Sequence, residues 1–452
     1  MSDNGHYLVT TDGKPFFYLG DTAWELIHRL NREEAARYLE NRAKKGFTVI
    51  QAVALAEVGG LDTPNAYGDL PLVNKDPVKP AVTNGADPAD SAQYDYWDHL
   101  DFIVRTAADK GLYIGLLPSW GEWVLPRFGP QYFTDERQAY AYGHFIGDRY
   151  KSFYNIIWIM GGDRHPDEKP DGFVIWRALA EGVADGTNGV KKLDSLADYA
   201  STCMTYHSFP TSSKFFHKDD WIDFHMWGSY HMAKSDSTAY RVAWADWSLP
   251  NHKPTINGEP AYEDHPINWE PEKGWFDDFD VRQIAYWSVF AGAHGHTYGC
   301  HPIWQFYTKK SPYVSPTRRT WQEVLDLPGS FQVQHLKHLI LSRPVLERVP
   351  DQSLVVGEAG KGERHVQATR GTDYAFVYLP TAHPVPVQLG KISGGKVKAW
   401  WFNPRTGTAD AIGVFPNRGT RTFKPKGATG PGNDWVLVLD DADKKYGTPG
   451  KR

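Results

Sequence analysis

Short runs of apolar, β-branched and aromatic residues alternate with longer segments whose apolar residues recur at helical spacing. The short runs predict eight strands, which begin at Phe16, Phe47, Leu112, Asn155, Met204, Asp223, Lys253 and His294. The segments between them predict helices, as in NREEAARYLENRAKKG, where Asn31 is a candidate N-cap and Gly46 a candidate C-terminal stop. Eight strands alternating with helices over about 340 residues predict an α/β fold, a (β/α)₈ TIM barrel.

The pattern changes near Arg343. The segments HVQATRGTDYAFVYLP, PVPVQLGKI, KVKAWWFNPRTG and DWVLVLDD predict short strands separated by Gly, Pro and Asn turns, with no helical stretch among them. We therefore expect a (β/α)₈ catalytic barrel over residues 1–345 and a small all-β sandwich domain over residues 351–452.

Charge and cysteine usage exclude several kinds of partner and site. The chain of 452 residues has 49 Lys and Arg against 54 Asp and Glu, without a long run of one sign, so nothing indicates nucleic acid or an anionic membrane as a partner. Cys203 and Cys300 lie far apart without a CxxC spacing, which argues against a disulfide framework and a structural zinc site. No window reaches the roughly 18 apolar residues of a membrane span.

The first residues, MSDNGHYLVTTDGKPFF, lack a basic region followed by an apolar stretch. No export signal is therefore indicated. We expect a cytoplasmic protein from the sequence as written, or a periplasmic or secreted one if a leader has been removed.

In a (β/α)₈ barrel the active site lies at the carboxyl ends of the strands, so the polar residues that close each apolar run are the candidates. They are Asp21, Glu57, Trp120, Glu122, Asp163, His207, the stretch His225 to His231, Glu259 and the stretch His294 to His301. The chain also has 18 Trp and 24 Tyr, which pack in cores or provide stacking platforms for a sugar ring. Acids at the ends of several strands, with aromatic residues beside them, indicate a pocket that binds a ligand rich in hydroxyls and transfers protons.

Asp163 and Glu259 follow the fourth and the seventh predicted strand, and each comes after a glycine. Glycoside hydrolysis needs two carboxylates across a pocket, and a separation near about 5 Å favours the retaining course. In that role Glu259 is the nucleophile and Asp163 the acid and later the base. The alternative is structural, with Asp163 paired to Arg164 and Glu259 capping the next loop. Glu263 and Asp264 lie beyond Pro260 and are expected in the loop.

Two other classes stay open at this point. His294, His296 and His301, together with His207, His225 and His231, could form the site of a zinc-dependent hydrolase. Such barrels usually open with an HxH pair on the first strand, whereas this chain reads LGDTAW there. A non-catalytic carbohydrate-binding protein would explain the aromatic residues without requiring an acid pair.

Several long motifs carry a family resemblance. FYLGDTAWELIHRLNREEAARYLENRAKKGFTVIQAVALAEVGGLDTPNAYGDLPL, NIIWIMGGDRHP, INGEPAYEDHP, VRQIAYWSVFAGAHGHTYGCHPIWQ and SRPVLERVPDQSL resemble glycoside hydrolase family 140, the apiosidases, from about Phe16 to Leu354. The remainder resembles the C-terminal domain that accompanies this family and carries a collagen-binding label.

The resemblance implies a barrel of the large retaining clan, with no metal or other cofactor. Carried over by motif, the Asp of GGDR is Asp163 as acid/base, and the Glu of NGEP is Glu259 as nucleophile. The clan usually ends its fourth strand in Asn-Glu, whereas this chain has Gly162-Asp163, so a shorter acid must be brought closer by the backbone. The implied reaction is exo release of terminal D-apiose from rhamnogalacturonan II or from plant apiosides. The alternative is another furanosidase of the clan, such as an arabinofuranosidase.

A single terminal furanose would fit a narrow pocket. Under this resemblance Trp24, Trp120, Trp227 and Trp304 are the candidate walls. Candidate contacts to the sugar hydroxyls are Asp21, Glu57, Asn65, His207, Tyr230 and His296.

Overall fold

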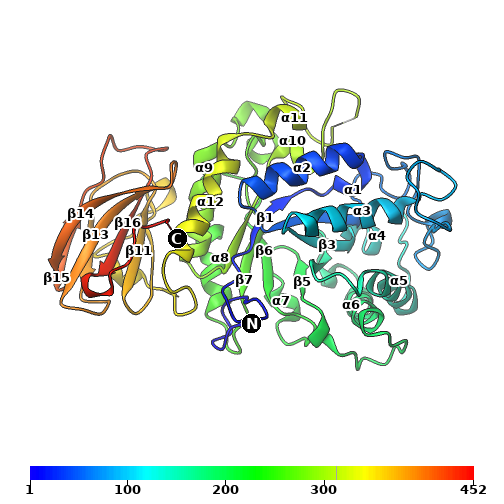
Figure 1. The fold of residues 1–452 in the computed structure, drawn as a ribbon, viewed down its shortest axis with the longest axis horizontal. Helices are drawn as coiled ribbons and strands as arrows, with labels where there is room; N and C mark the ends of the chain where they lie inside the picture. Colours follow the sequence, from blue (N-terminus) through cyan, green and yellow to red (C-terminus); the bar gives the residue numbers. More distant parts are fainter. Residues whose placement is uncertain (312, 452) are drawn as a thin grey trace. The chain divides into compact units, whose positions relative to one another are not determined.

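The computed structural model describes residues 1–311 and 313–451. Eight parallel strands form a near-closed barrel sheet in the order β5-β4-β3-β2-β1-β8-β7-β6. The strands, drawn in Figure 1, are β1 Leu19–Thr22, β2 Val49–Leu55, β3 Tyr113–Ser119, β4 Ile156–Gly161, β5 Met204–His207, β6 His225–Gly228, β7 Thr255–Glu259 and β8 Gly295–Tyr298. All eight predicted strands are confirmed. Beside the two edge strands, the Asp223 amide donates to the Met204 carbonyl at 2.9 Å.

The chain divides into two compact units, each built from separate segments. The first, here called the central unit, consists of residues 20–228 and 301–325. The second, the composite unit, consists of residues 1–19, 229–300 and 326–452. It therefore includes the segment of β7 and β8 as well as the C-terminal strands.

Helices follow the strands, as the sequence predicted. Their bounds are α1 Leu26–Arg29, α2 Arg32–Lys44, α3 Tyr96–Asp109, α4 Gly121–Val124, α5 Glu136–Tyr150, α6 Gly172–Asn188, α7 Ser213–Phe216, α8 Thr238–Trp247, α9 Asp278–Phe290, α10 His301–Trp304, α11 Trp321–Val324 and α12 Pro328–Leu341. Asn31 caps α2 as predicted, because its side chain accepts a hydrogen bond from the Glu34 amide. Over the described part of the chain, no helix is both long enough and apolar enough to cross a bilayer.

Helices α5 and α6 of the central unit pack at unusually close range. Glycines of each helix face the backbone of the other: a Cβ built on Gly147 would lie 2.3 Å from the Val183 carbonyl oxygen, and one on Gly182 would lie 2.3 Å from that of Tyr140. Real Cβ atoms do not approach so closely, so only glycine allows this contact.

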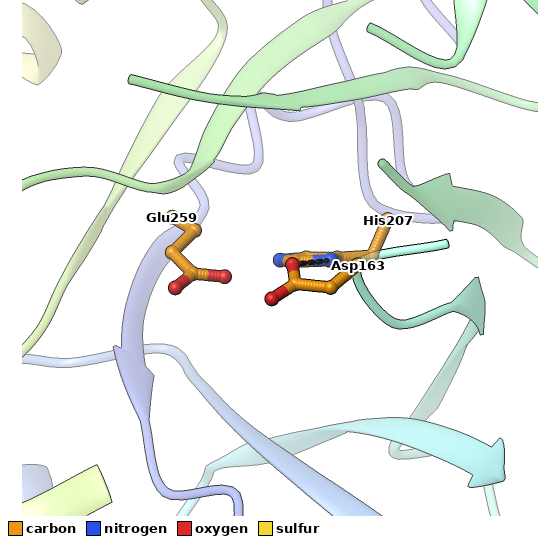
Figure 2. Close-up of side chains that lie close together, drawn as sticks. All are labelled: Asp163, His207 and Glu259. Carbon is orange, nitrogen blue, oxygen red and sulfur yellow. Dashed lines mark ion pairs between the residues drawn. The ribbon is translucent and has the colours of Figure 1, made fainter. Parts of the chain in front are cut away.

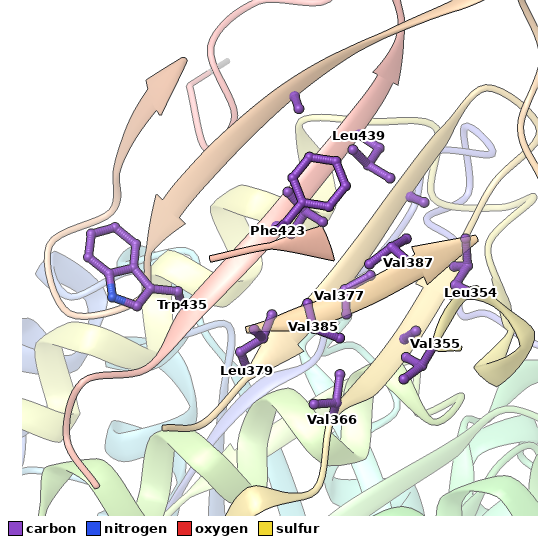
Figure 3. Packing of buried hydrophobic residues seen from close by; sticks show 14 of the residues in the cluster. Leu354, Val355, Val366, Val377, Leu379, Val385, Val387, Phe423, Trp435 and Leu439 are labelled. Atoms are coloured by element: carbon purple, nitrogen blue, oxygen red, sulfur yellow. The ribbon is translucent and has the colours of Figure 1, made fainter. Parts of the chain in front are cut away.

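The C-terminal strands form a β domain of two antiparallel sheets. Their bounds are β9 Val349–Pro350, β10 Gln367–Arg370, β11 Tyr374–Leu379, β12 Val385–Leu389, β13 Lys396–Asn403, β14 Thr408–Pro416, β15 Gly419–Phe423 and β16 Trp435–Asp441. One sheet has the order β14-β13-β16-β11-β10-β9 and the other pairs β12 with β15. Figure 3 shows Val387 and Phe423 of the small sheet in one apolar cluster with Val377 and Leu439 of the large sheet. The predicted all-β domain is confirmed, although the sequence did not indicate β14 and β15.

Buried ion pairs join the β domain to helices of the same composite unit. Arg282 of α9 donates to both carboxylate oxygens of Asp434, at 2.9 and 3.2 Å, and both residues are buried. Arg343, just after α12, binds Asp440 of β16 in the same bidentate way, at 2.7 Å for each bond. Such pairs are costly to break from one side, because the remaining charge stays buried.

Candidate active site

Glu259 is the last residue of β7, as predicted, and only 6% of its surface is exposed. Its backbone is tied to the segment that follows β6: the amides of Ser229 and Tyr230 both donate to the Glu259 carbonyl at 3.1 Å. The side chain of Asn257, two residues earlier, donates to the Ser229 hydroxyl at 2.9 Å. The segment that follows β6 therefore fixes the strand end that carries this carboxylate.

A cluster of rings packs around His231, which lies beside the Glu259 carboxylate in the composite unit. The Nε2 atom of His231 lies 3.3 Å from Glu259 Oε1. The His231 ring stacks on that of His265 at 4.1 Å and packs against Tyr262 at 4.3 Å and Trp269 at 5.6 Å between ring centres. Sequence reasoning named His231 as the end of a histidine-containing stretch and as a candidate zinc ligand, and not as a partner of Glu259. Its position three residues after β6 is the signal that could have distinguished it.

Asp163 lies two residues beyond β4, on a backbone that glycines shape. Gly161 and Gly162 have φ of +92° and +109°, and Asp163 itself has φ of +58°. A Cβ on Gly161 would lie 2.3 Å from the His207 carbonyl oxygen, and one on Gly162 would lie 2.7 Å from the Gly121 amide nitrogen. This tight turn is how the backbone brings the short acid of GGDR into position.

The Asp163 side chain is 35% exposed and pairs with a buried histidine. Nδ1 of His207, the last residue of β5, lies 3.7 Å from Asp163 Oδ1. Arg164 does not take the predicted structural role as the ion partner of Asp163: its guanidinium binds Glu122 and the Asp163 backbone carbonyl. The Asp163 carboxylate therefore lies beside an imidazole.

Two of the predicted tryptophans lie beside His207 in the central unit. The rings of Trp24 and Trp120 are 5.5 Å apart, and each faces His207, at 5.4 and 6.1 Å. Both indoles are almost fully buried. Trp24 follows β1 and Trp120 follows β3, so these residues come together at the carboxyl ends of the strands, where the sequence placed them.

Three of the predicted residues form one group. Figure 2 shows the carboxylates of Asp163 and Glu259 turned toward each other, with the His207 ring beside Asp163. One oxygen or ring nitrogen from each of the three side chains lies within 4.8 Å of those of the other two. Two carboxylates at this distance can act on one glycosidic bond, one by proton transfer at its oxygen and the other by attack on its carbon.

Asp21, a predicted contact to the sugar, has a structural partner in the barrel. The residue lies inside β1, is fully buried and pairs with Arg42 of α2 at 2.5 Å. The hydroxyl of Tyr38, also on α2, donates to the same carboxylate oxygen. Asp21 therefore anchors α2 to the barrel.

Asn65 and Glu57 lie in the segment that follows β2. The side-chain oxygen of Asn65 accepts the amides of Tyr67 and Asp69 at 2.9 and 3.0 Å, so this end of the side chain holds its own loop. Glu57 is half-buried, two residues beyond the strand. A role for either residue in sugar binding stays a prediction.

The remaining candidates occupy three different places. Trp227 is fully buried within β6, whereas Tyr230 is partly exposed in the segment that follows it. Trp304 of α10 donates its indole N–H to His301 at 3.1 Å. His296 is fully buried in β8, where burial lowers its pKa to about 3, and neither ring nitrogen has a hydrogen-bond partner within residues 1–311 and 313–451.

Three of the histidines considered for a zinc site have other partners. His294 Nδ1 donates to the Thr255 carbonyl at 2.9 Å, and His301 contacts the Ser315 hydroxyl and the Pro316 carbonyl. His225 bonds His217 at 2.9 Å. Among the described residues, the one grouping of three metal-ligand side chains is Asp163, His207 and Glu259.

Glu263, predicted as a loop residue, is buried. Its carboxylate accepts the Tyr298 hydroxyl at 2.6 Å and the Gly329 amide at 3.2 Å. Burial raises its pKa to about 7, although these two hydrogen bonds act in the opposite direction.

A near-closed barrel of eight parallel strands, with an acid pair and two neighbouring indoles at the strand ends, is typical of a glycoside hydrolase. The comparisons agree with this class: residues 2–347 match the family model described as the apiosidase-like catalytic domain. The chain belongs to the apiosidase-like family. Residues 349–440 match a second model, named for a collagen-binding domain of a collagenase.

Solved structures support the same assignment. A glycoside hydrolase is 36% identical to this chain, with a TM-score of 0.87, over 99% of this chain and 97% of its own. A glycoside hydrolase family 5 protein from Bacteroides vulgatus ATCC 8482 is 35% identical to this chain, with a TM-score of 0.87. The match covers 99% of this chain and 94% of that protein. A search of curated proteins finds no match.

Proposed function

We propose that the protein is a retaining exo-glycosidase that releases terminal D-apiose from plant glycans such as rhamnogalacturonan II, or from apiosides. Glu259 is the nucleophile and Asp163 the acid/base. The observation that carries the proposal is the facing pair of carboxylates shown in Figure 2. The family description supports apiose as the sugar.

The separation of the carboxylates supports the retaining course. One oxygen of Asp163 lies within 4.8 Å of one oxygen of Glu259. Retaining enzymes hold the two groups about 5 to 5.5 Å apart, whereas inverting enzymes leave about 6.5 to 9.5 Å for a water molecule.

Each step of the proposed mechanism has a donor and an acceptor. An oxygen of Glu259 attacks the anomeric carbon, the glycosidic C–O bond breaks, and Asp163 gives its proton to the departing oxygen. Water then attacks the same carbon, Asp163 takes the proton of that water, and the bond to Glu259 breaks. Both groups return to their starting states, and the sugar keeps its anomeric configuration.

The test is a screen of 4-nitrophenyl furanosides and pectic side-chain oligosaccharides, with the released sugar identified and its anomeric configuration followed by NMR. We expect apiofuranosides to be cleaved with retention, and Glu259→Gln to bind without turnover. Preference for arabinofuranosides would support the alternative furanosidase. An inverted product, or equal turnover by Glu259→Gln, would refute the mechanism.

Chemical rescue assigns the acid/base. Asp163→Ala should keep its first step on an activated aryl glycoside, because the leaving group needs little protonation, and should stall at the glycosyl-enzyme. Added azide should restore turnover and yield a glycosyl azide of retained configuration. Absence of rescue, with a folded variant, would remove Asp163 from this role.

The same three side chains would also suit a metal ion, since two carboxylates and an imidazole are metal-ligand types. A metal-dependent hydrolase predicts loss of activity in EDTA and recovery on adding zinc. The two-carboxylate mechanism predicts unchanged rates in EDTA, so this measurement separates the two.

A further inference from the structure

The hydrogen bonds around His231 determine which ring nitrogen carries the proton. The backbone amide of Tyr262 donates to Nδ1 at 3.3 Å. An amide N–H is only a donor, so Nδ1 must present its lone pair. The proton of the neutral ring then lies on Nε2, which is 3.3 Å from Glu259 Oε1 and donates to it.

The His231 ring is also fixed in place. The residue is 1% exposed, and its own carbonyl accepts the Asn268 amide at 2.7 Å. The titratable groups whose rings or oxygens face it are Glu259, Tyr262, His265 and Tyr230. His265 is held in turn, because its Nδ1 donates to the Pro266 carbonyl at 2.6 Å.

We infer that His231 is the positioning residue for the nucleophile: as the Nε2–H tautomer, it donates to Glu259, sets the orientation of that carboxylate and favours its ionised form. This inference rests on the proposed nucleophilic role of Glu259. The Tyr262 amide, which belongs to the loop that follows Glu259, selects the tautomer. His231 therefore acts through Glu259 and takes no proton itself.

Two substitutions separate the two hydrogen bonds of the ring. In His231→Gln the longer amide can place an N–H where Nε2 lies, so the bond to Glu259 is kept. In His231→Asn the shorter side chain can accept from the Tyr262 amide but cannot reach Glu259. We expect His231→Asn and His231→Phe to lower kcat roughly 10- to 100-fold with KM unchanged, as for a misplaced reacting group, and His231→Gln to recover most of the rate.

The pH profile adds a readout that a purely structural role would not change. A hydrogen bond donated to a carboxylate favours its ionised form. The acid limb of kcat/KM should therefore move to higher pH in His231→Asn and His231→Phe, and stay in place in His231→Gln. The control is His294→Phe, which removes another buried imidazole that bonds Thr255 at the opposite end of β7. Equal rates in the Gln and Asn variants, or an unmoved acid limb in both, would overturn the inference.

The tautomer can be measured without any substrate. Long-range ¹H–¹⁵N spectra of the full protein labelled at histidine should show His231 with a protonated Nε2 and an unprotonated Nδ1, with His231→Gln providing the assignment. A protonated Nδ1 would overturn the inference whatever the activity. If the furanoside screen gave no turnover while this tautomer was observed, the proposed function alone would fail.

Discussion

Asp163 has a backbone conformation that few residue types tolerate. Its φ of +58° follows two glycines of positive φ, and among residues with a Cβ, aspartate and asparagine are the most tolerant of this region. The sequence Gly-Gly-Asp therefore suits the backbone of this turn.

Asn at position 163 keeps that conformational tolerance and removes the acid. We expect Asp163→Asn to fold and to lose about 10²- to 10⁴-fold in kcat/KM on glycosides with poor leaving groups, the usual contribution of general acid catalysis. The loss should shrink as the leaving group becomes more acidic. A series of aryl glycosides measures this dependence, and a loss independent of the leaving group would contradict the acid role.

Glu263 should make stability depend on pH. Its folded pKa is raised to about 7 from 4.5, so the stability that the protonated form contributes is fully present below about pH 4.5 and is lost as pH rises through about 7. The neutral Glu263→Gln can keep an oxygen toward the Gly329 amide and avoids the buried charge. At pH 8 the free energy of unfolding of Glu263→Gln should exceed that of the wild type by on the order of 2–3 kcal/mol. Near pH 5 the two free energies should differ little.

Thermal unfolding of both proteins between pH 5 and 8.5 checks this expectation. A difference in unfolding midpoint that does not change with pH would contradict it. Glu259→Gln serves as a second comparison, because it removes a carboxylate from the same chain segment without touching Tyr298 or Gly329.

At the level of elements, the contact between α5 and α6 depends on glycine. Alanine stabilises a helix interior by roughly 1 kcal/mol relative to glycine, whereas overpacking costs about 1–3 kcal/mol. Because the Cβ of Gly182→Ala would meet the Tyr140 carbonyl oxygen at 2.3 Å, we expect the clash to dominate and the unfolding midpoint to fall. The control is Gly430→Ala, whose Cβ meets nothing within 4 Å; an equal fall there would refute the packing argument.

The elements that the sequence predicted are those with a buried face. β2, β3 and β4 are mainly apolar runs, and β2 is buried along its whole length. β14 and β15 were missed because most of their residues are exposed or half-buried, so their apolar pattern is weak. Asp21 was misplaced because β1 continues through Thr22: the residue lies within the strand and faces α2, whereas the sequence placed it just beyond the strand.

For the candidate site, the sequence predicted where the two carboxylates lie along the chain but not which side chains contact them. Glu259 and Asp163 follow apolar runs directly, and parallel strands bring such ends to one edge. His231 could not be assigned from the sequence, because its role depends on a hydrogen bond to a residue 28 positions away. Strand periodicity does not specify such a contact.

For the whole molecule, the ion pairs of Arg282 and Arg343 suggest that the β domain and the helices of the composite unit fold together. We propose residues 1–345 and 351–452 as the two domains, supported by the change from helices to strands after α12. Arg282 and Asp434 are both fully buried, and the Tyr378 hydroxyl also donates to Asp434 at 3.2 Å. The stacked rings of Tyr286 on α9 and Tyr378 on β11, 4.8 Å apart, extend this junction.

Asp434→Ala tests whether the two domains unfold as one. Removing one partner of a buried pair typically costs about 3–5 kcal/mol, because the other charge stays buried without compensation. We expect calorimetry of the full chain to show a single transition that moves as a whole to lower temperature in this variant. Asp410→Ala, which removes an exposed pair with Lys426 in the same domain, should leave the transition nearly unchanged, since exposed pairs contribute little. Two resolved transitions, with only one of them shifted by Asp434→Ala, would instead mean that the domains unfold independently and that the junction stabilises the β domain alone.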